Sequence, residues 1–276
     1  MANEVKQTGL RAFNQTITSP ATQKYLADVL GERKGSFVNN LTALVANNAN
    51  LQECEPYTLM FAAMKATALN LPLDPSLGMA FCIPYKNTKR GVTEAQFQIG
   101  AKGFKQLALR TGRFKRINVT DVREGELAGR NRLTGEMQFR FEDDDEKRLK
   151  LPIIGYCSYF ILHDGYESTL YMSKEEVMAH GKRYSQTFRS DKDYIRNKSL
   201  WVTDFDDMAL KTVLKLNISR NAPLSVEMQD AMQADQAVIR DNGKYDYVDN
   251  EQQILDAQKA QDVAEKFADF DNAEEV

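Results

Sequence analysis

The spacing of apolar residues changes at about residue 79, and this change is the strongest constraint on how the chain folds. Before it, Leu59, Met60 and Met64 recur at helical spacing. After it, Met79 and Phe81 begin a run with apolar residues at every second position. Apolar residues three or four apart line one face of a helix, whereas those two apart line one face of a strand. A chain that contains both patterns in succession predicts an α+β fold.

Helices are predicted for the N-terminal part. Ser19 followed by Pro20 indicates a helix start, because serine caps the free N–H groups and proline suits the first helical position. Further helices are predicted over residues 37–51 and from Pro56 to about Leu69.

A first hairpin is predicted from residues 79–85 and 95–99, which alternate around a polar turn. Its tip carries three bases, Lys86, Lys89 and Arg90. A short helix over residues 100–111 and a strand over residues 117–123 are predicted to follow.

Residues 124–150 are predicted to form an excursion from the main fold. It contains a strand at residues 137–141 and an acidic run at 142–146, which we interpret as a solvated turn. A second hairpin is predicted next, because residues 155–163 and 166–172 flank an Asp-Gly dipeptide, a strong hairpin-turn signal.

The region after the second hairpin is predicted to be helical again. Ser173 and Glu176 have the spacing of a capping box, so a helix is expected to start there. Residues 180–198 are predicted to contain a mobile loop between two helices, and residues 193–219 carry a long helical pattern that Pro223 ends.

Charge is distributed unevenly along the chain. Residues 225–276 hold 14 acidic and 4 basic residues, a net charge of -10, whereas residues 1–224 hold 25 acidic and 32 basic residues, a net charge of +7. This asymmetry is typical of a basic body that meets a polyanion and carries an acidic tail. We therefore predict a mobile acidic tail (225–276) behind a basic body, which we divide into an N-terminal arm (1–35) and a core (36–224). The arm is expected to contact other copies through the apolar faces of its helices, and the tail is a candidate partner-binding segment.

Cysteine and histidine usage disfavours several classes of protein. Cys54, Cys82 and Cys157 lie far apart, and neither His163 nor His180 has a cysteine nearby, so neither a disulfide framework nor a zinc site is expected. No run of about 18 apolar residues and no secretory signal occur, which predicts a cytoplasmic protein without a membrane span.

The first of three chemically informative segments is AKGFKQLALRTGRFKR, residues 101–116. It holds six bases and no acid: Lys102, Lys105, Arg110, Arg113, Lys115 and Arg116. Phe104 and Phe114 lie among them. Cations that meet phosphates, with rings that stack on bases, suit a single strand of nucleic acid, so we include Phe104 as a stacking candidate. The alternative is that both rings belong to the core.

The second segment, residues 180–198, mixes bases with aromatic rings in the same way. We assign six of its residues to the same nucleic-acid surface: Lys182, Arg183, Tyr184, Arg189, Arg196 and Lys198.

The third segment is the helical pattern from Trp201 onward. Its predicted buried stripe consists of Trp201, Phe205, Met208, Thr212 and Leu216. A second stripe carries acids and bases. Asp207 and Lys211 have the spacing of a helix-stabilising ion pair, whereas Lys211 and Lys215, one turn apart, would alternatively hold successive phosphates.

Asp204, Asp206 and Asp207 raise the alternative of a Mg²⁺-dependent nuclease. Their spacing is poor for this, because Asp206 and Asp207 point about 100° apart on a helix. No GxxxxGK[ST], GxSxG or HExxH motif occurs. We therefore expect no catalytic site and no nucleotide cofactor, and the sequence leaves the effect of divalent cations open.

Four ordered motifs resemble those of the RecT family of phage and prophage single-strand annealing proteins. They are ALNLPLDPSLGMAFCIPYKN, QFQIGAKGFKQLALRTG, DVREGE and WVTDFDDMALKTVLK. The resemblance covers about residues 36–220. It implies a β-β-β-α annealing core to which N-terminal helices are added.

The resemblance also implies a function. Such a protein would be an ATP-independent recombinase that coats single-stranded DNA as a ring or helical filament and anneals it to a complementary strand. The family motifs carry over to Lys102, Lys105, Arg110, Lys211 and Lys215. Position 101 is alanine where relatives often carry an aromatic residue, so no stacking role is carried over there.

The implied partners are the two DNA strands, other copies of the chain and a phage 5′→3′ exonuclease, all in the cytoplasm of a bacterial host. The acidic tail would recruit the exonuclease or the host single-strand-binding protein, or would compete with DNA. A passive single-stranded DNA-binding protein is the alternative.

Overall fold

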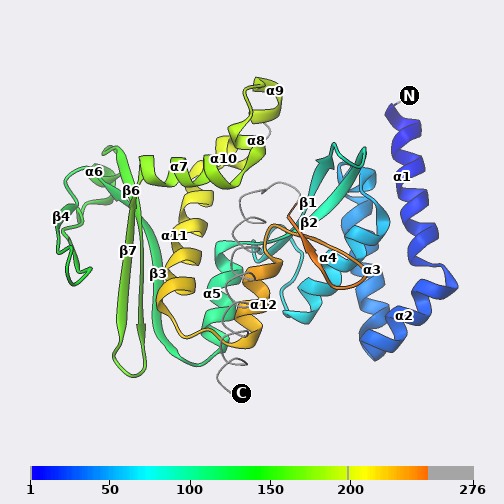
Figure 1. The fold of residues 1–276 in the computed structure, drawn as a ribbon, viewed down its shortest axis with the longest axis horizontal. Coiled ribbons are helices and arrows are strands. Elements are labelled where there is room, and N and C mark those ends of the chain that lie inside the picture. The colour runs from blue at the N-terminus through cyan, green and yellow to red at the C-terminus, as the bar shows by residue number, and fades with distance from the viewer. Residues whose placement is uncertain (1, 198, 248–276) are drawn as a thin grey trace, which may run out of the picture.

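The computed structural model describes residues 2–197 and 199–247. Its first part is helical, as the sequence predicts (Figure 1). The helices are α1 (Ala2–Ile17), α2 (Pro20–Leu30), α3 (Lys34–Ala46) and α4 (Pro56–Ala68), with short 3₁₀ turns η1 (Gly31–Arg33) and η2 (Leu51–Glu53). The start of α2 is as predicted, because the Ser19 side chain accepts from the Thr22 N–H and Pro20 occupies the first helical position.

The N-terminal arm packs against its own chain. Helix α1 contacts α4 and η2, and α2 contacts α3. Phe13 and Ile17 of α1 and Leu26 and Leu30 of α2 are buried in the main hydrophobic core. Much of the apolar face that we assigned to contacts between copies is therefore covered within one chain.

The first predicted hairpin is confirmed. Strands β1 (Ala80–Asn87) and β2 (Val92–Ile99) pair antiparallel, from Ala80 opposite Ile99 to Asn87 opposite Val92. Within the tip, Arg90 forms ion pairs with Glu55 and with the buried Glu94. Helix α4 packs against β2, which joins the hairpin to the N-terminal helices.

The centre of the second half is a three-stranded antiparallel sheet in the order β3-β6-β7. Its strands are β3 (Phe114–Arg123), β6 (Ile153–Leu162) and β7 (Glu167–Ser173). Helix α5 (Ala101–Arg110) leads into β3, and helix α11 (Phe205–Asn221) crosses one face of the sheet (Figure 1). The chain is therefore mixed α and β, with an antiparallel three-stranded sheet that helix α11 covers on one face.

The excursion between β3 and β6 contains the predicted strand, together with a second strand and a helical turn that were not predicted. It consists of the strands β4 (Leu127–Arg130) and β5 (Met137–Phe139) and the one-turn helix α6 (Asp145–Arg148). The acidic run lies in and before α6, with its side chains exposed.

The single long helix predicted over residues 193–219 is wrong. The chain forms α7 (Lys174–Tyr184), α8 (Gln186–Arg189), α9 (Asp193–Arg196) and α10 (Leu200–Thr203) before α11 begins. The start of α7 has the predicted capping box. The break before α11 places Trp201 in a core, where its ring stacks on Phe188 with centroids 5.8 Å apart. Burial of this large ring outweighs the continuity of one helix.

The predicted start of the acidic tail at residue 225 needs correction. Residues 225–247 form helix α12 (Val226–Ala234) and the strands β8 (Val238–Ile239) and β9 (Tyr245–Asp246). Met228, Ala231 and Ala234 are buried against the body, and the backbone of Ala237 bridges to Phe97 of β2. The packed part of the chain therefore extends to at least residue 247, and the rest of the predicted tail lies outside the described residues.

Candidate nucleic-acid interface

Helix α5 presents its bases to solvent. Phe104, Leu107 and Ala108 are buried, whereas Lys102 and Lys105 lie on the opposite face and are exposed. The amphipathic spacing of the segment produces this division. Gly103 lets this helix pack closely against the preceding segment, because a Cβ at position 103 would lie 2.1 Å from the Met79 carbonyl oxygen.

A β-bulge at the start of β3 exposes two adjacent bases. Strand residues normally alternate between faces, but the pairing of β3 with β6 shifts register between Phe114 and Arg116. Phe114 and Ile117 are buried on either side, and both Lys115 and Arg116 are exposed. Together with Arg113 in the preceding turn and the two lysines of α5, they form what we call the α5–β3 surface: Lys102, Lys105, Arg113, Lys115 and Arg116.

Arg110 is part of the predicted set but has a structural role. Its guanidinium donates to the carbonyl oxygens of Leu69 and Asn70, at 2.8 Å each. These carbonyls follow the end of α4, where backbone acceptors lack helical partners. Arg110 therefore attaches α5 to α4, and its contact with DNA stays a prediction.

The structure contradicts the stacking role of Phe104. Its ring is fully buried, and Phe114 is also buried, against Phe160 at a centroid distance of 5.4 Å. The alternative that both rings belong to the core is the correct one. The Lys215 ammonium lies 5.7 Å from the Phe104 ring centroid, so this ring contacts a cation.

Lys211 and Lys215 share one buried carboxylate. Lys211 Nζ lies 3.1 Å from Asp235 Oδ1 and Lys215 Nζ lies 2.8 Å from Asp235 Oδ2. The predicted pair between Asp207 and Lys211 is wrong, because Lys211 is directed inward to Asp235. The Lys211 side chain is 8% exposed and that of Lys215 is 24% exposed. The predicted phosphate contact is therefore far more accessible at Lys215 than at Lys211.

Electrostatics account for the charge of Asp235. Burial opposes ionisation, but the two ammonium groups and the Ile99 N–H, which donates to Oδ1 at 2.8 Å, hold the pKa of Asp235 below its usual range. Burial lowers the pKa of Lys211, and the charge of Asp235 opposes that shift.

The second basic segment lies on α7, α8 and α9. Lys182, Arg183 and Arg189 are exposed, and the half-buried Arg196 pairs with Asp193. The Tyr184 ring is half-buried between His180, with centroids 4.5 Å apart, and the Arg183 guanidinium. The predicted mobile loop is thus built of short helical turns, and Lys198 lies outside the described residues.

No nucleophile or metal centre accompanies these bases in the part of the chain that the structure describes. Burial raises the pKa of Cys54, Cys82 and Cys157 to about 12, which keeps the thiols protonated and unreactive. The Tyr156 hydroxyl donates to Asp206. Within residues 2–197 and 199–247, no three His, Cys, Asp or Glu residues are grouped so that they could hold a metal ion.

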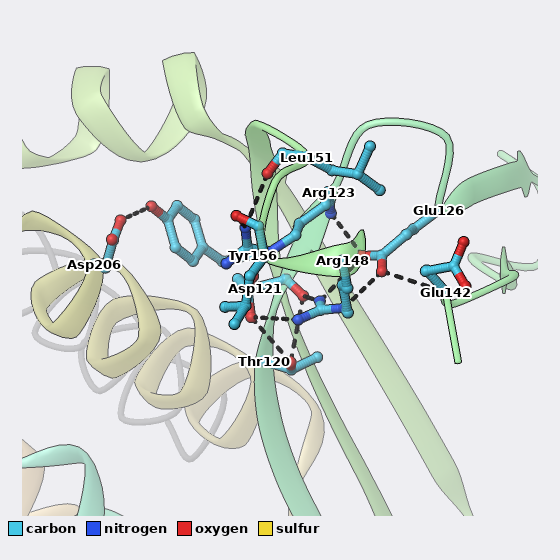
Figure 2. A network of polar contacts seen from close by, with 10 residues as sticks. Thr120, Asp121, Arg123, Glu126, Glu142, Arg148, Leu151, Tyr156 and Asp206 are labelled. Atoms are coloured by element: carbon cyan, nitrogen blue, oxygen red, sulfur yellow. Dashed lines mark hydrogen bonds and ion pairs between the residues drawn. The ribbon is translucent and has the colours of Figure 1, made fainter. Parts of the chain in front are cut away.

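Three of the four charged residues of the DVREGE motif, Asp121, Arg123 and Glu126, form a network with Arg148 instead of a surface site (Figure 2). The Arg148 guanidinium donates to Glu126 at 2.6 Å and to Asp121 at 3.3 Å, and Arg123 donates to Asp121 at 2.7 Å. Burial opposes the charge of Glu126, but hydrogen bonds from Arg148 and from backbone N–H groups keep its pKa low. This network attaches the excursion to the edge of the sheet.

Comparison with known proteins identifies the family of the chain. The RecT family matches residues 35–252, most of the chain. The chain belongs to the RecT family. It is 40% identical to the uncharacterized protein YqaK of Bacillus subtilis (strain 168) over 216 residues, which cover 78% of this chain and 69% of YqaK. It is 24% identical to protein RecT of Escherichia coli (strain K12) over 270 residues, which cover 90% of this chain and 91% of that protein.

Sequence reasoning missed Asp235 in this RecT-family chain, because we assigned it to the acidic tail. A signal was present: Asp235 stands in the apolar stretch ADQAVI, where a lone carboxylate predicts a buried partner. Among the described residues, no helix is long and apolar enough to cross a membrane.

Proposed function

We propose that this chain coats single-stranded DNA and anneals it to a complementary strand without a nucleotide cofactor. The match to the RecT family over residues 35–252 carries this proposal. The α5–β3 surface supports it, because five exposed bases lie in one short segment that contains no acidic residue.

In the proposed mechanism, the protein binds the phosphates of one strand and positions its bases for pairing. Cations of the α5–β3 surface neutralise the phosphates of one strand and leave its base edges free. A second strand then tests complementarity by base pairing, and pairing and stacking drive the reaction. Lys182, Arg183, Arg189 and Arg196 extend the grip, and Tyr184 supplies a ring beside them.

The proposal includes assembly and partners. Copies of the chain would line a strand as a ring or helical filament, which needs two different patches that meet head to tail. A phage 5′→3′ exonuclease would supply the strand in the bacterial cytoplasm. The acidic tail would bind that exonuclease or the host single-strand-binding protein.

Annealing of two labelled complementary oligonucleotides, followed by fluorescence quenching without nucleotide, tests the function. We expect faster pairing of the complementary strands and no effect on a non-complementary pair. Binding without acceleration would instead identify a passive single-stranded DNA-binding protein. Shortening of the DNA only when Mg²⁺ is added would identify a nuclease.

A charge-matched pair of variants tests the surface. The variant Lys115→Gln with Arg116→Gln should make the slope of log affinity against log salt shallower by about 1.4, or about 0.7 for each lost single-strand phosphate contact. The matched control is Arg130→Gln with Arg132→Gln, two exposed bases at the far end of the β4–β5 hairpin. If the slope became equally shallow in both double variants, the α5–β3 surface would have no special role in DNA binding.

A further inference from the structure

We propose that Asp235 is a positioning residue, which fixes the Lys215 ammonium at the junction of α5 and α11 as a DNA phosphate contact, while Lys211 serves only to balance the buried charge. This inference rests on the proposed function. It assigns a part in DNA binding to residues 225–247, a segment whose sequence predicts only an acidic tail.

The geometry separates the two lysines. Both ammonium groups contact the same carboxylate, yet the Lys211 side chain is 8% exposed and that of Lys215 is 24% exposed. A phosphate is too large and too strongly hydrated to enter the enclosed space around Lys211 without unfolding part of the chain. Of the two lysines, only Lys215 can therefore be reached by a phosphate from the rim of the junction.

Lys215 is held on two sides and retains a donor. An ammonium group has three N–H donors. One is directed to Asp235 Oδ2 at 2.8 Å, and the group also lies 5.7 Å from the centroid of the Phe104 ring. A lysine fixed in this way loses little side-chain entropy when a phosphate binds, whereas a free lysine must be ordered at that moment.

Charge balance gives the reason for two lysines. One carboxylate between two ammonium groups leaves a net charge of +1 at the junction. Lys211 offsets the charge of Asp235 on the closed side of the junction, and Lys215 contacts the phosphate on the open side. Asp235 itself cannot turn away, because the N–H of Ile99 donates to it and its neighbour Gln236 donates to the Phe97 carbonyl.

Single substitutions of the lysines give the first test, read as the salt dependence of single-stranded DNA binding by the full chain. Lys215→Gln should weaken binding about tenfold at low salt, the loss of one charge-assisted contact, and make the slope shallower by about 0.7. Lys211→Met should leave the slope unchanged. The control Lys147→Gln removes an exposed charge on α6 and should change neither quantity. An equal loss of slope from the two test variants would overturn the proposal.

A double substitution tests Asp235 itself. Asp235→Asn alone leaves Lys211 as an unpaired buried charge and risks unfolding. Asp235→Asn with Lys211→Met removes one negative and one positive charge together, and its fold is checked by circular dichroism and urea unfolding. We expect binding three- to tenfold weaker, with little further loss when Lys215→Gln is added, because Lys215 is no longer held.

Two results would overturn the positioning role. Tighter binding with a steeper slope in the double variant would mean that Asp235 masks Lys215 from DNA. Unchanged binding would mean that Lys215 makes no phosphate contact that depends on Asp235. If the unaltered chain anneals DNA but the Lys215 variants have no effect, only this inference fails; if the unaltered chain does not bind DNA, the proposed function and the inference both fail.

Discussion

At the scale of single residues, three buried carboxylates hold together segments that are far apart in sequence. Glu94 accepts from Arg240, 146 residues away, and Asp235 accepts from Ile99, 136 residues away. Glu126 accepts from Arg148 across the excursion. Each carboxylate is almost completely buried and each is ionised by its partners, so the partners cannot be removed without cost.

Gly181 should tolerate no side chain. A Cβ at this position would lie 2.7 Å from the Trp201 ring, so Gly181→Ala is expected to destabilise the chain by about 1–3 kcal/mol despite the better helix propensity of alanine. Gly35→Ala is the control, since nothing lies within 4 Å of its Cβ, and it should raise stability by about 0.5–1 kcal/mol. Urea unfolding measures both, and equal effects would show that the ring does not limit position 181.

His180 predicts a pH dependence of stability. Burial, with a further contribution from nearby positive charges, lowers its pKa from 6.5 to about 4. His180 therefore takes up a proton near pH 6.5 in the unfolded chain, but only near pH 4 in the folded chain. The resulting stability is complete above pH 6.5 and is lost as the pH falls to about 4, by up to about 3 kcal/mol.

Urea unfolding at intervals between pH 7.5 and 4.5 checks this dependence. His180→Gln should flatten the fall in stability, whereas His163→Gln, at an exposed turn, should leave it in place. A fall of the same size in the His180→Gln chain would assign the pH dependence to other groups.

At the scale of elements, the excursion is a surface hairpin attached by buried charges. In the part of the chain that the structure describes, strands β4 and β5 pair with each other alone, and the network of Asp121, Arg123, Glu126 and Arg148 joins the excursion to β3. The hairpin should therefore respond as a unit when that network is broken.

Arg148→Met tests this attachment. It leaves Glu126 buried without its guanidinium partner, which should cost about 3 kcal/mol and speed amide hydrogen exchange in β4 and β5 before the rest of the chain. Lys147→Met, the neighbouring exposed residue, should have almost no effect. Uniform protection of the hairpin in the Arg148 variant would show that other contacts hold it.

The elements that depend on local pattern could be predicted from the sequence. Alternation predicted the first hairpin, the Asp-Gly turn predicted the second, the helical period predicted α4 and α5, and Ser173 with Glu176 predicted the start of α7. The break before α11 could not be predicted, because it depends on how Trp201 packs against residues on other helices. A tertiary contact of this kind overrides a local period.

At the scale of the whole molecule, residues 225–247 complete the body. They contribute Asp235 to the α5–α11 junction, Arg240 to Glu94, and Asp230 to an ion pair with Lys65 at 2.9 Å. The exposed bases of the candidate site were predictable from composition, but the pairing of Lys211 and Lys215 with Asp235 was not, since nothing local links them.

Two truncations test the importance of this segment. A chain that ends at Leu224 loses Asp235 and leaves Lys211 buried without a counter-charge, so it should unfold at clearly lower urea concentration than a chain that ends at Tyr247. Adding Lys211→Met to the shorter chain should recover part of the difference. Equal unfolding midpoints for the two chains would contradict the structural role of residues 225–247.

The bridge between Phe97 and Ala237 has a consequence for folding during synthesis. Phe97 is synthesised about 140 residues before Ala237, so this edge of β2 lacks the Ala237 bridge for roughly 7–30 seconds at about 5–20 residues per second. An open strand edge is a template for association with other chains. Ribosome-bound chains that stop before residue 235 should therefore show faster hydrogen exchange in β2 than released chains, and equal protection would show that the hairpin settles without its last partner.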